Sequence, residues 1–176
     1  LHLLTNQVRA APHEFAGWDT SLAGPEPRPP LALQPELFAA ARYHADDMAA
    51  AGCFQHASCD GTPAGERIRR FFSGPSGENI AVGYPTPHAA MVGWMNSDGH
   101  RRNILEPSWN ALGTGAASGN HWVQNFGRDA APAPAGVVAA ALAAADAATV
   151  RLAAHFHDPS GQAAVSVSAA LDGAQV

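Results

Sequence analysis

Residues 77–83 read Gly77-Glu78-Asn79-Ile80-Ala81-Val82-Gly83, with a single carboxylate directly before a short apolar run. A carboxylate in this position is either exposed on a loop or buried with a partner. Because an unpaired buried charge is costly, a buried Glu78 predicts a nearby cation, histidine or other hydrogen-bond donor. Two of the nine histidines, His56 and His100, lie on either side of this stretch in the sequence.

Apolar periodicity predicts helices on both sides of residues 77–83. In the clearest one, a proline suits the first helical position, a glycine ends the run, and small or apolar residues recur at helical spacing. The expected helices are residues 3–10, residues 35–52, a helix from about residue 62 that carries Ile68 and Phe71 or Phe72 inward, and residues 86–97. His44 sits beside Asp46 and Asp47 on the second helix, and we expect it on a solvated face.

After Asn110 the pattern changes to that of strands. Residues 111–117 and 121–126 flank Ser118-Gly119-Asn120, which is typical of a β-hairpin turn. Helices followed by strands predict an α+β fold.

The last third of the chain has a different composition. Residues 130–136 are an Ala/Pro linker, which places the main domain at residues 1–129 and a β-rich extension at residues 137–176. Within the extension, residues 149–157 and 163–170 are strand-like runs around a turn at 158–161. These strands either add to the main sheet or begin a truncated second domain, and we favour the second interpretation.

Four motifs, in order, resemble those of the CAP superfamily of cysteine-rich secretory, antigen 5 and pathogenesis-related proteins, in its bacterial SCP-like branch. Residues 77–81 resemble its GENIA motif, and residues 4–9 are similar to its first helix. Residues 94–105, which run from Trp94 through Gly99-His100-Arg101-Arg102-Asn103, and residues 121–127 look like its two later motifs. The resemblance covers about residues 1–128 and implies an α-β-α sandwich with a small antiparallel sheet and a cleft on one side.

In many relatives two histidines and two glutamates line that cleft, and the histidines can bind a divalent metal such as zinc. By motif, these histidines match His56 and His100, and Glu78 matches the first glutamate. The second glutamate is replaced by Ser97. Since durable zinc sites have at least three protein ligands, we expect a weak, pH-dependent site at most, with Glu78 as a ligand or as a group that orients a histidine.

Other site patterns are weaker. Ser97 lies three residues before His100, but the strand-turn-helix elbow of a nucleophilic serine is missing. The run from His44 to Asp47 lacks the spacing of a helical metal motif. Trp94, Trp109, Trp122 and Phe126 are expected in the core, and Trp18 is expected to cover the first helix.

The only two cysteines, Cys53 and Cys59, are close in sequence. Such a pair forms a small-loop disulfide in a secreted protein, whereas in a cytosolic protein it would be half of a metal site. We favour the disulfide and an extracellular location. The chain begins at Leu1 rather than Met, which we interpret as removal of a signal peptide.

The charge balance bears on the partners. The formal net charge is -5 and there is no lysine, a composition that suggests a GC-rich bacterial genome and disfavours nucleic acid as a partner. No apolar run is long enough for a transmembrane helix.

Three functions remain open at this point. The first, which we favour, is a non-enzymatic extracellular module that binds a ligand, surface or partner through the cleft around His56, Glu78 and His100. The second is a metal-assisted hydrolase in which Glu78 is the general base. The third is a lipid-binding protein, which requires an apolar groove between helices.

Overall fold

The computed structural model describes residues 1–19, 26–130, 136–144, 149–157 and 165–172, the last three ranges as backbone strands only. A four-stranded sheet has the order β1-β3-β4-β2. Its strands are β1 (Ala32–Leu33), β2 (Ser76–Val82), β3 (Ala111–Ala117) and β4 (His121–Gly127). All pairs are antiparallel except β1 with β3.

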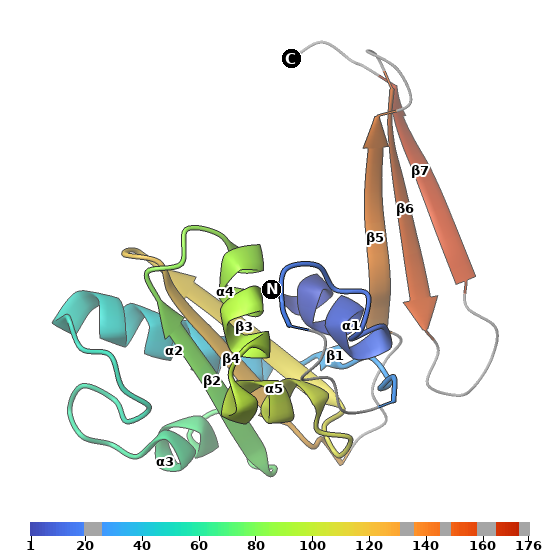
Figure 1. The fold of residues 1–176 in the computed structure, drawn as a ribbon. Coiled ribbons are helices and arrows are strands. Elements are labelled where there is room, and N and C mark those ends of the chain that lie inside the picture. The colour runs from blue at the N-terminus through green and yellow to red at the C-terminus, as the bar shows by residue number, and fades with distance from the viewer. Residues whose placement is uncertain (20–25, 131–135, 145–148, 158–164, 173–176) are drawn as a thin grey trace.

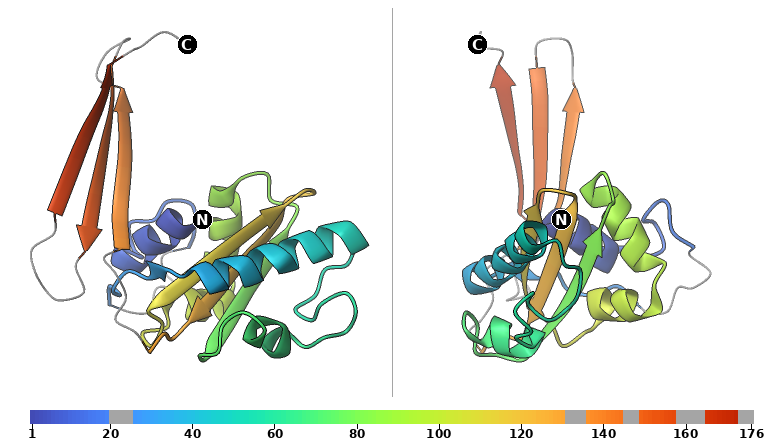
Figure 2. Two further views of the ribbon diagram at one scale, coloured as in Figure 1. Left: turned by 180° about the vertical axis from the view of Figure 1, so that it is seen from behind. Right: turned by 90° about the vertical axis from the view of Figure 1, so that its left-hand side faces the viewer.

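Helices cover both faces of this sheet (Figures 1 and 2). One face packs against α2 (Pro35–Ala51), with α3 (Ala64–Arg69) at its end. The other face packs against α1 (His2–Ala10), α4 (Pro87–Met95) and α5 (Asp98–Leu105). The structure therefore confirms the α+β class and the predicted sandwich.

Two glycines of β3 bring α2 unusually close to the sheet. A Cβ added at Gly113 would lie 2.0 Å from the backbone carbon of Leu37, and one at Gly115 would lie 2.3 Å from the carbonyl oxygen of Ala41. A side chain at either position would therefore collide with helix backbone, which cannot give way as a flexible side chain can. This close packing aims one face of α2 into the sheet, and His44 lies on that face.

The opposite face holds the larger core cluster. Trp94 and Phe126 are buried there, Trp109 and Trp122 pack against it partly buried, and Trp18 is buried in its loop. The core positions predicted for Trp94 and Phe126 are confirmed, whereas Trp109 and Trp122 lie at the margin of the core. The Trp94 indole N–H also donates to the Ile80 carbonyl at 3.0 Å. This hydrogen bond satisfies a carbonyl of β2, which is an edge strand of the sheet.

The predicted order of helices followed by strands is wrong. Strand β2 lies between α3 and α4, and β1 precedes α2. The apolar part of β2 is only about four residues long, and a run that short is compatible with strand, helix or loop. Helix α4 ends at Met95, and an extended Ser97 begins α5, a separate helix that was not predicted.

The C-terminal strands form a separate three-stranded sheet in the order β5-β6-β7. They are β5 (Gly136–Ala144), β6 (Thr149–His157) and β7 (Val165–Asp172), and Figure 1 shows them as a sheet of their own. The strand predicted at 149–157 is confirmed, the next is shifted by two residues, and β5 was not predicted. The turn at 158–161 and linker residues 131–135 lie outside the described residues, so the domain boundary stays a prediction.

Among the described residues, no helix combines the length and apolarity needed to cross a membrane.

Candidate functional site

A buried carboxylate organises the site. Glu78, on β2, has a side chain that is only 4% exposed and forms an ion pair with the fully buried Arg67. Its Oε1 lies 3.0 Å from His56 Nδ1. Its Oε2 accepts a further hydrogen bond, at 3.0 Å, from the side-chain NH₂ group of Asn125. In this orientation of the amide, the Asn125 oxygen accepts from the Ala41 N–H. Glu78 thus has the cationic and hydrogen-bonding partners that its burial predicted.

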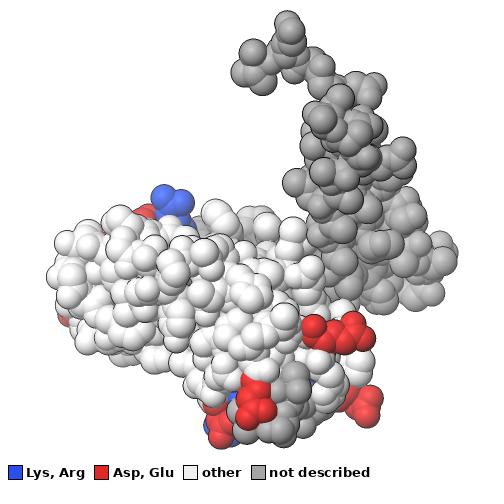
Figure 3. All heavy atoms as spheres, turned by 45° about the horizontal axis from the view of Figure 1, so that its top comes forward, with Lys and Arg blue, Asp and Glu red and all other residues white. Residues whose placement is uncertain are grey.

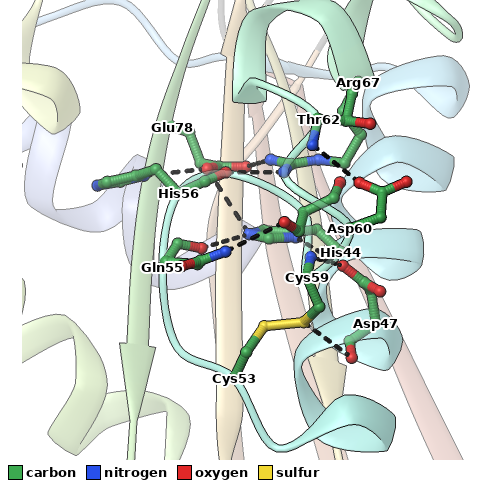
Figure 4. Close-up of a disulfide and its surroundings, with 11 residues drawn as sticks. His44, Asp47, Cys53, Gln55, His56, Cys59, Asp60, Thr62, Arg67 and Glu78 are labelled. Atoms are coloured by element: carbon green, nitrogen blue, oxygen red, sulfur yellow. Dashed lines mark hydrogen bonds and ion pairs between the residues drawn. A yellow bond between two sulfur atoms is a disulfide. The ribbon is translucent and has the colours of Figure 1, made fainter.

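Arg67 is the principal residue that the sequence did not identify. It lies in the last turn of α3, and its guanidinium donates from Nη1 to the His56 carbonyl at 2.8 Å while it pairs with Glu78 through Nη2. One side chain therefore joins the loop that carries His56 to the strand that carries Glu78 (Figure 4). The signal in the sequence was indirect: a buried glutamate requires a cation, but several arginines were available.

The contact with Glu78 determines which nitrogen of His56 faces outward. An ionised carboxylate only accepts hydrogen bonds, so Nδ1 must carry the proton. In the neutral ring the lone pair is then on Nε2, which points away from Glu78 in Figure 4. The side chain is 54% exposed, so this nitrogen is accessible. The hydrogen bond that His56 donates to Glu78 raises the pKa of His56.

His44 contradicts the prediction that it is solvated. Its side chain is fully buried, and its Nε2 donates to the Gln55 carbonyl at 3.0 Å. Its two nitrogens lie 3.9 Å from carboxylate oxygens of Asp47 and Glu78. Burial lowers the pKa of His44, which favours the neutral ring. The missed signal was its spacing, since it is seven residues after Leu37 and three after Ala41, on the buried face of α2.

The loop between α2 and α3 is fixed at several points. Cys53 and Cys59 form the predicted disulfide. The Asp47 carboxylate accepts the Cys59 N–H at 2.9 Å, and the Thr62 carbonyl accepts the Ser58 N–H at 2.8 Å. Together with the contact from Arg67, these bonds hold the segment that presents His56.

The other two predicted residues come from α5. His100 is half-buried, and desolvation, followed by the charge of His56, lowers its pKa. The lowered pKa favours the neutral ring of His100. Ser97 is at the N-cap of α5 without a side-chain capping bond, and both residues line a groove of about 260 Å³. No hydrogen bond joins Ser97 to His100 among the described side chains.

The donor set limits the metal chemistry. Within the described ranges, no group of three or more His, Cys, Asp or Glu is arranged to hold a metal ion. Glu78 is committed to Arg67 and His56, which leaves Nε2 of His56 and the ring of His100 as candidate ligands. Two imidazoles fit a weak site completed by water or ligand, and they do not fit a closed structural site.

Comparison with known proteins supports this reading of the fold. The model of the cysteine-rich secretory protein (CAP) family matches residues 4–126. The uncharacterized Bacillus subtilis protein YkwD is 37% identical over 100 residues, which are 55% of this chain and 39% of that protein. The chain thus spans about two-fifths of the length of this curated relative.

Two solved structures are also similar. An extracellular SCP-domain protein of Bacillus anthracis is 35% identical with a TM-score of 0.54, over 58% of this chain and 35% of that one. A cysteine-rich secretory protein of Staphylococcus aureus has a TM-score of 0.50 over 73% of this chain and 38% of that one, and at 16% identity it supports the fold alone. The family match covers well over half of the chain, so the chain belongs to the cysteine-rich secretory protein (CAP) family.

Proposed function

We propose that this chain is an extracellular binding module, and that its ligand or partner docks at the cleft containing His56 and His100. The observation that carries the proposal is the engagement of Glu78. Both of its carboxylate oxygens have partners, Arg67 on one and His56 on the other. A general base needs a free oxygen near its substrate, so Glu78 serves as an anchor that orients His56.

A divalent metal is part of the proposed binding. His56 Nε2 and His100 would hold it, and the ion would supply a Lewis-acidic contact for an oxygen or nitrogen of the ligand. Glu78 would stay behind His56, fixing the tautomer that ligation requires. Proton competition at His56 keeps such a site weak below neutral pH.

The surface supports an extracellular partner that is not nucleic acid. On the face drawn in Figure 3, blue arginine groups are sparse and red acidic groups are scattered. Nucleic acids require clustered positive charge, which this face does not offer. The B. anthracis relative is described as extracellular, and the disulfide suits an oxidising compartment.

Calorimetric titration with zinc at pH 7.5 tests the proposal. We expect weak saturable heat for the wild type, loss of that heat in His56→Ala and in His100→Ala, and no change in His13→Ala, a control at an exposed histidine. Identical isotherms for all four proteins would remove the metal from the proposal. Peptide hydrolysis that disappears in Glu78→Gln would replace the binding function with the hydrolase.

A second candidate function, lipid binding, is supported by another cavity. A mainly apolar groove of about 400 Å³ lies beside α1 and α4 and is lined by Leu4, Ala11, Phe15 and His88, among others. A fluorescent fatty acid such as cis-parinaric acid is the probe. Binding that Ala11→Trp abolishes by filling the groove would favour this function, and an unchanged emission spectrum would reject it.

A further inference from the structure

The groove that contains Ser97 and His100 has an aromatic rim. It is lined by nine residues, and three of these, Phe54, Val82 and Tyr84, are large apolar side chains that are 37–50% exposed. Trp94 and Ile80 form part of its buried lining. Exposed aromatic side chains gathered around one concavity are typical of binding sites, whereas isolated ones need no explanation.

The position of Tyr84 is fixed from two sides. The Trp122 indole N–H donates to the Tyr84 carbonyl at 2.9 Å. On α4, Gly93 leaves room for the Tyr84 hydroxyl, because a Cβ there would lie 2.4 Å from Tyr84 Oη. The absence of a side chain at Gly93 therefore lets the tyrosine pack against the helix.

Phe54 is also held, although half of its surface is exposed. It directly follows Cys53, inside the disulfide loop that presents His56. The disulfide at Cys53 fixes the backbone before the phenylalanine, and the hydrogen bond from His44 to the Gln55 carbonyl fixes it after. The protein thus keeps an apolar ring in water on a rigid support, which lowers the ordering cost of binding a ligand.

The polarity of the groove specifies its ligand. None of its nine lining residues is Asp, Glu, Lys or Arg, so a charged ligand would lose hydration without gaining an ionic partner. Hydrogen-bonding groups come from the Ser97 and Tyr84 hydroxyls and the His100 ring. A purely apolar ligand would leave these groups unpaired.

We propose that this groove binds a neutral sugar ring of an extracellular glycan, with an apolar C–H face of the ring against Phe54 and Tyr84 and its hydroxyls toward Ser97 and His100. This inference deepens the proposed binding function and rests on it. The cavity of about 260 Å³ is below the range of drug-sized sites, which suits one ring of a longer chain. The sugar site needs no metal, although it shares His100 with the proposed metal-binding pair.

Nuclear magnetic resonance tests the inference. The indole N–H signal of Trp94, which lines the groove, is followed in EDTA while cellotriose, mannotriose or chitotriose is added to millimolar concentration. We expect saturable shifts with at least one of these neutral sugars. Phe54→Ala and Tyr84→Ala should each weaken binding by about three- to tenfold, the range expected for loss of one aromatic contact. Tyr43→Ala, at a similarly exposed tyrosine on α2, is the matched control and should bind as the wild type does.

Each alternative result has a separate meaning. The absence of saturable shifts with all three sugars would overturn the inference. Shifts with N-acetylphenylalanine amide but none with the sugars would also overturn it, in favour of a peptide side chain. Zinc is then titrated into the same protein after EDTA has been removed. A zinc response without a sugar response rejects the sugar site alone, and a sugar response without a zinc response removes only the metal from the proposed function.

Discussion

Removal of the Arg67 guanidinium is the strongest perturbation that the structure suggests. In Arg67→Met the apolar stem is approximately kept, but the carboxylate of Glu78, whose side chain is 4% exposed, loses its cation. Breaking a buried ion pair by removing one partner costs about 3–5 kcal/mol. The His56 carbonyl also loses a donor, which adds about 1 kcal/mol. The contacts of Glu78 with His56 and Asn125 remain and reduce the loss, so we expect about 3 kcal/mol in the free energy of unfolding.

Urea denaturation followed by tryptophan fluorescence measures this loss, and a second variant isolates its cause. Arg67→Met/Glu78→Gln removes both charges and should regain at least half of the lost stability, because no uncompensated charge stays buried. A loss below about 1 kcal/mol in Arg67→Met, or a double variant less stable than the single one, would show that the buried ion pair does not stabilise the site.

Three further predictions concern the fold around the site. Gly115→Ala should lower the unfolding free energy by about 1–3 kcal/mol because its Cβ meets the Ala41 carbonyl, whereas Gly99→Ala, in an open position on α5, should be neutral or stabilising in the same urea assay. Acidification below pH about 6.5 should destabilise the protein, because burial lowers the pKa of His44 and the unfolded chain is then protonated at this residue before the folded chain is. The pH dependence of the urea midpoint should therefore flatten in His44→Gln. An unchanged slope would exclude His44 as the source of this pH dependence. Replacing both cysteines by serine should lower the free energy of unfolding by about 2 kcal/mol, because the loop is short, and should weaken zinc binding. Full zinc affinity without the disulfide would show that other contacts suffice to hold His56.

Much of the fold could be predicted because its signals are local. Proline and threonine starts, the glycine after α2 and the turn at residues 118–120 each set an element boundary through backbone conformation. Strand β2 was not predicted because its burial comes from long-range packing between α2 on one face and α4 and α5 on the other. The division between α4 and α5 depends on the backbone of Ser97, which periodicity does not report.

The candidate site was predicted in part for the same reason. The motifs led to His56, Glu78 and His100, and the energetic cost of a buried carboxylate required a partner. The identity of that partner depends on where α3 packs, so Arg67 could not be chosen in advance. His44 was predicted wrongly because the neighbouring aspartates were given more weight than helical spacing, although the spacing placed it among buried residues.

The tautomer of His56 shows whether Glu78 is an anchor that turns His56 Nε2 toward the cleft. Long-range ¹H–¹⁵N correlation spectra of the histidine side chains, recorded above the pKa of His56, distinguish the two neutral forms. We expect a proton on Nδ1 and a free Nε2 in the wild type, with this preference weakened in Glu78→Gln. A His56 ring protonated on Nε2 in the wild type would exclude the anchor role of Glu78, because Nδ1 could not then donate to the carboxylate.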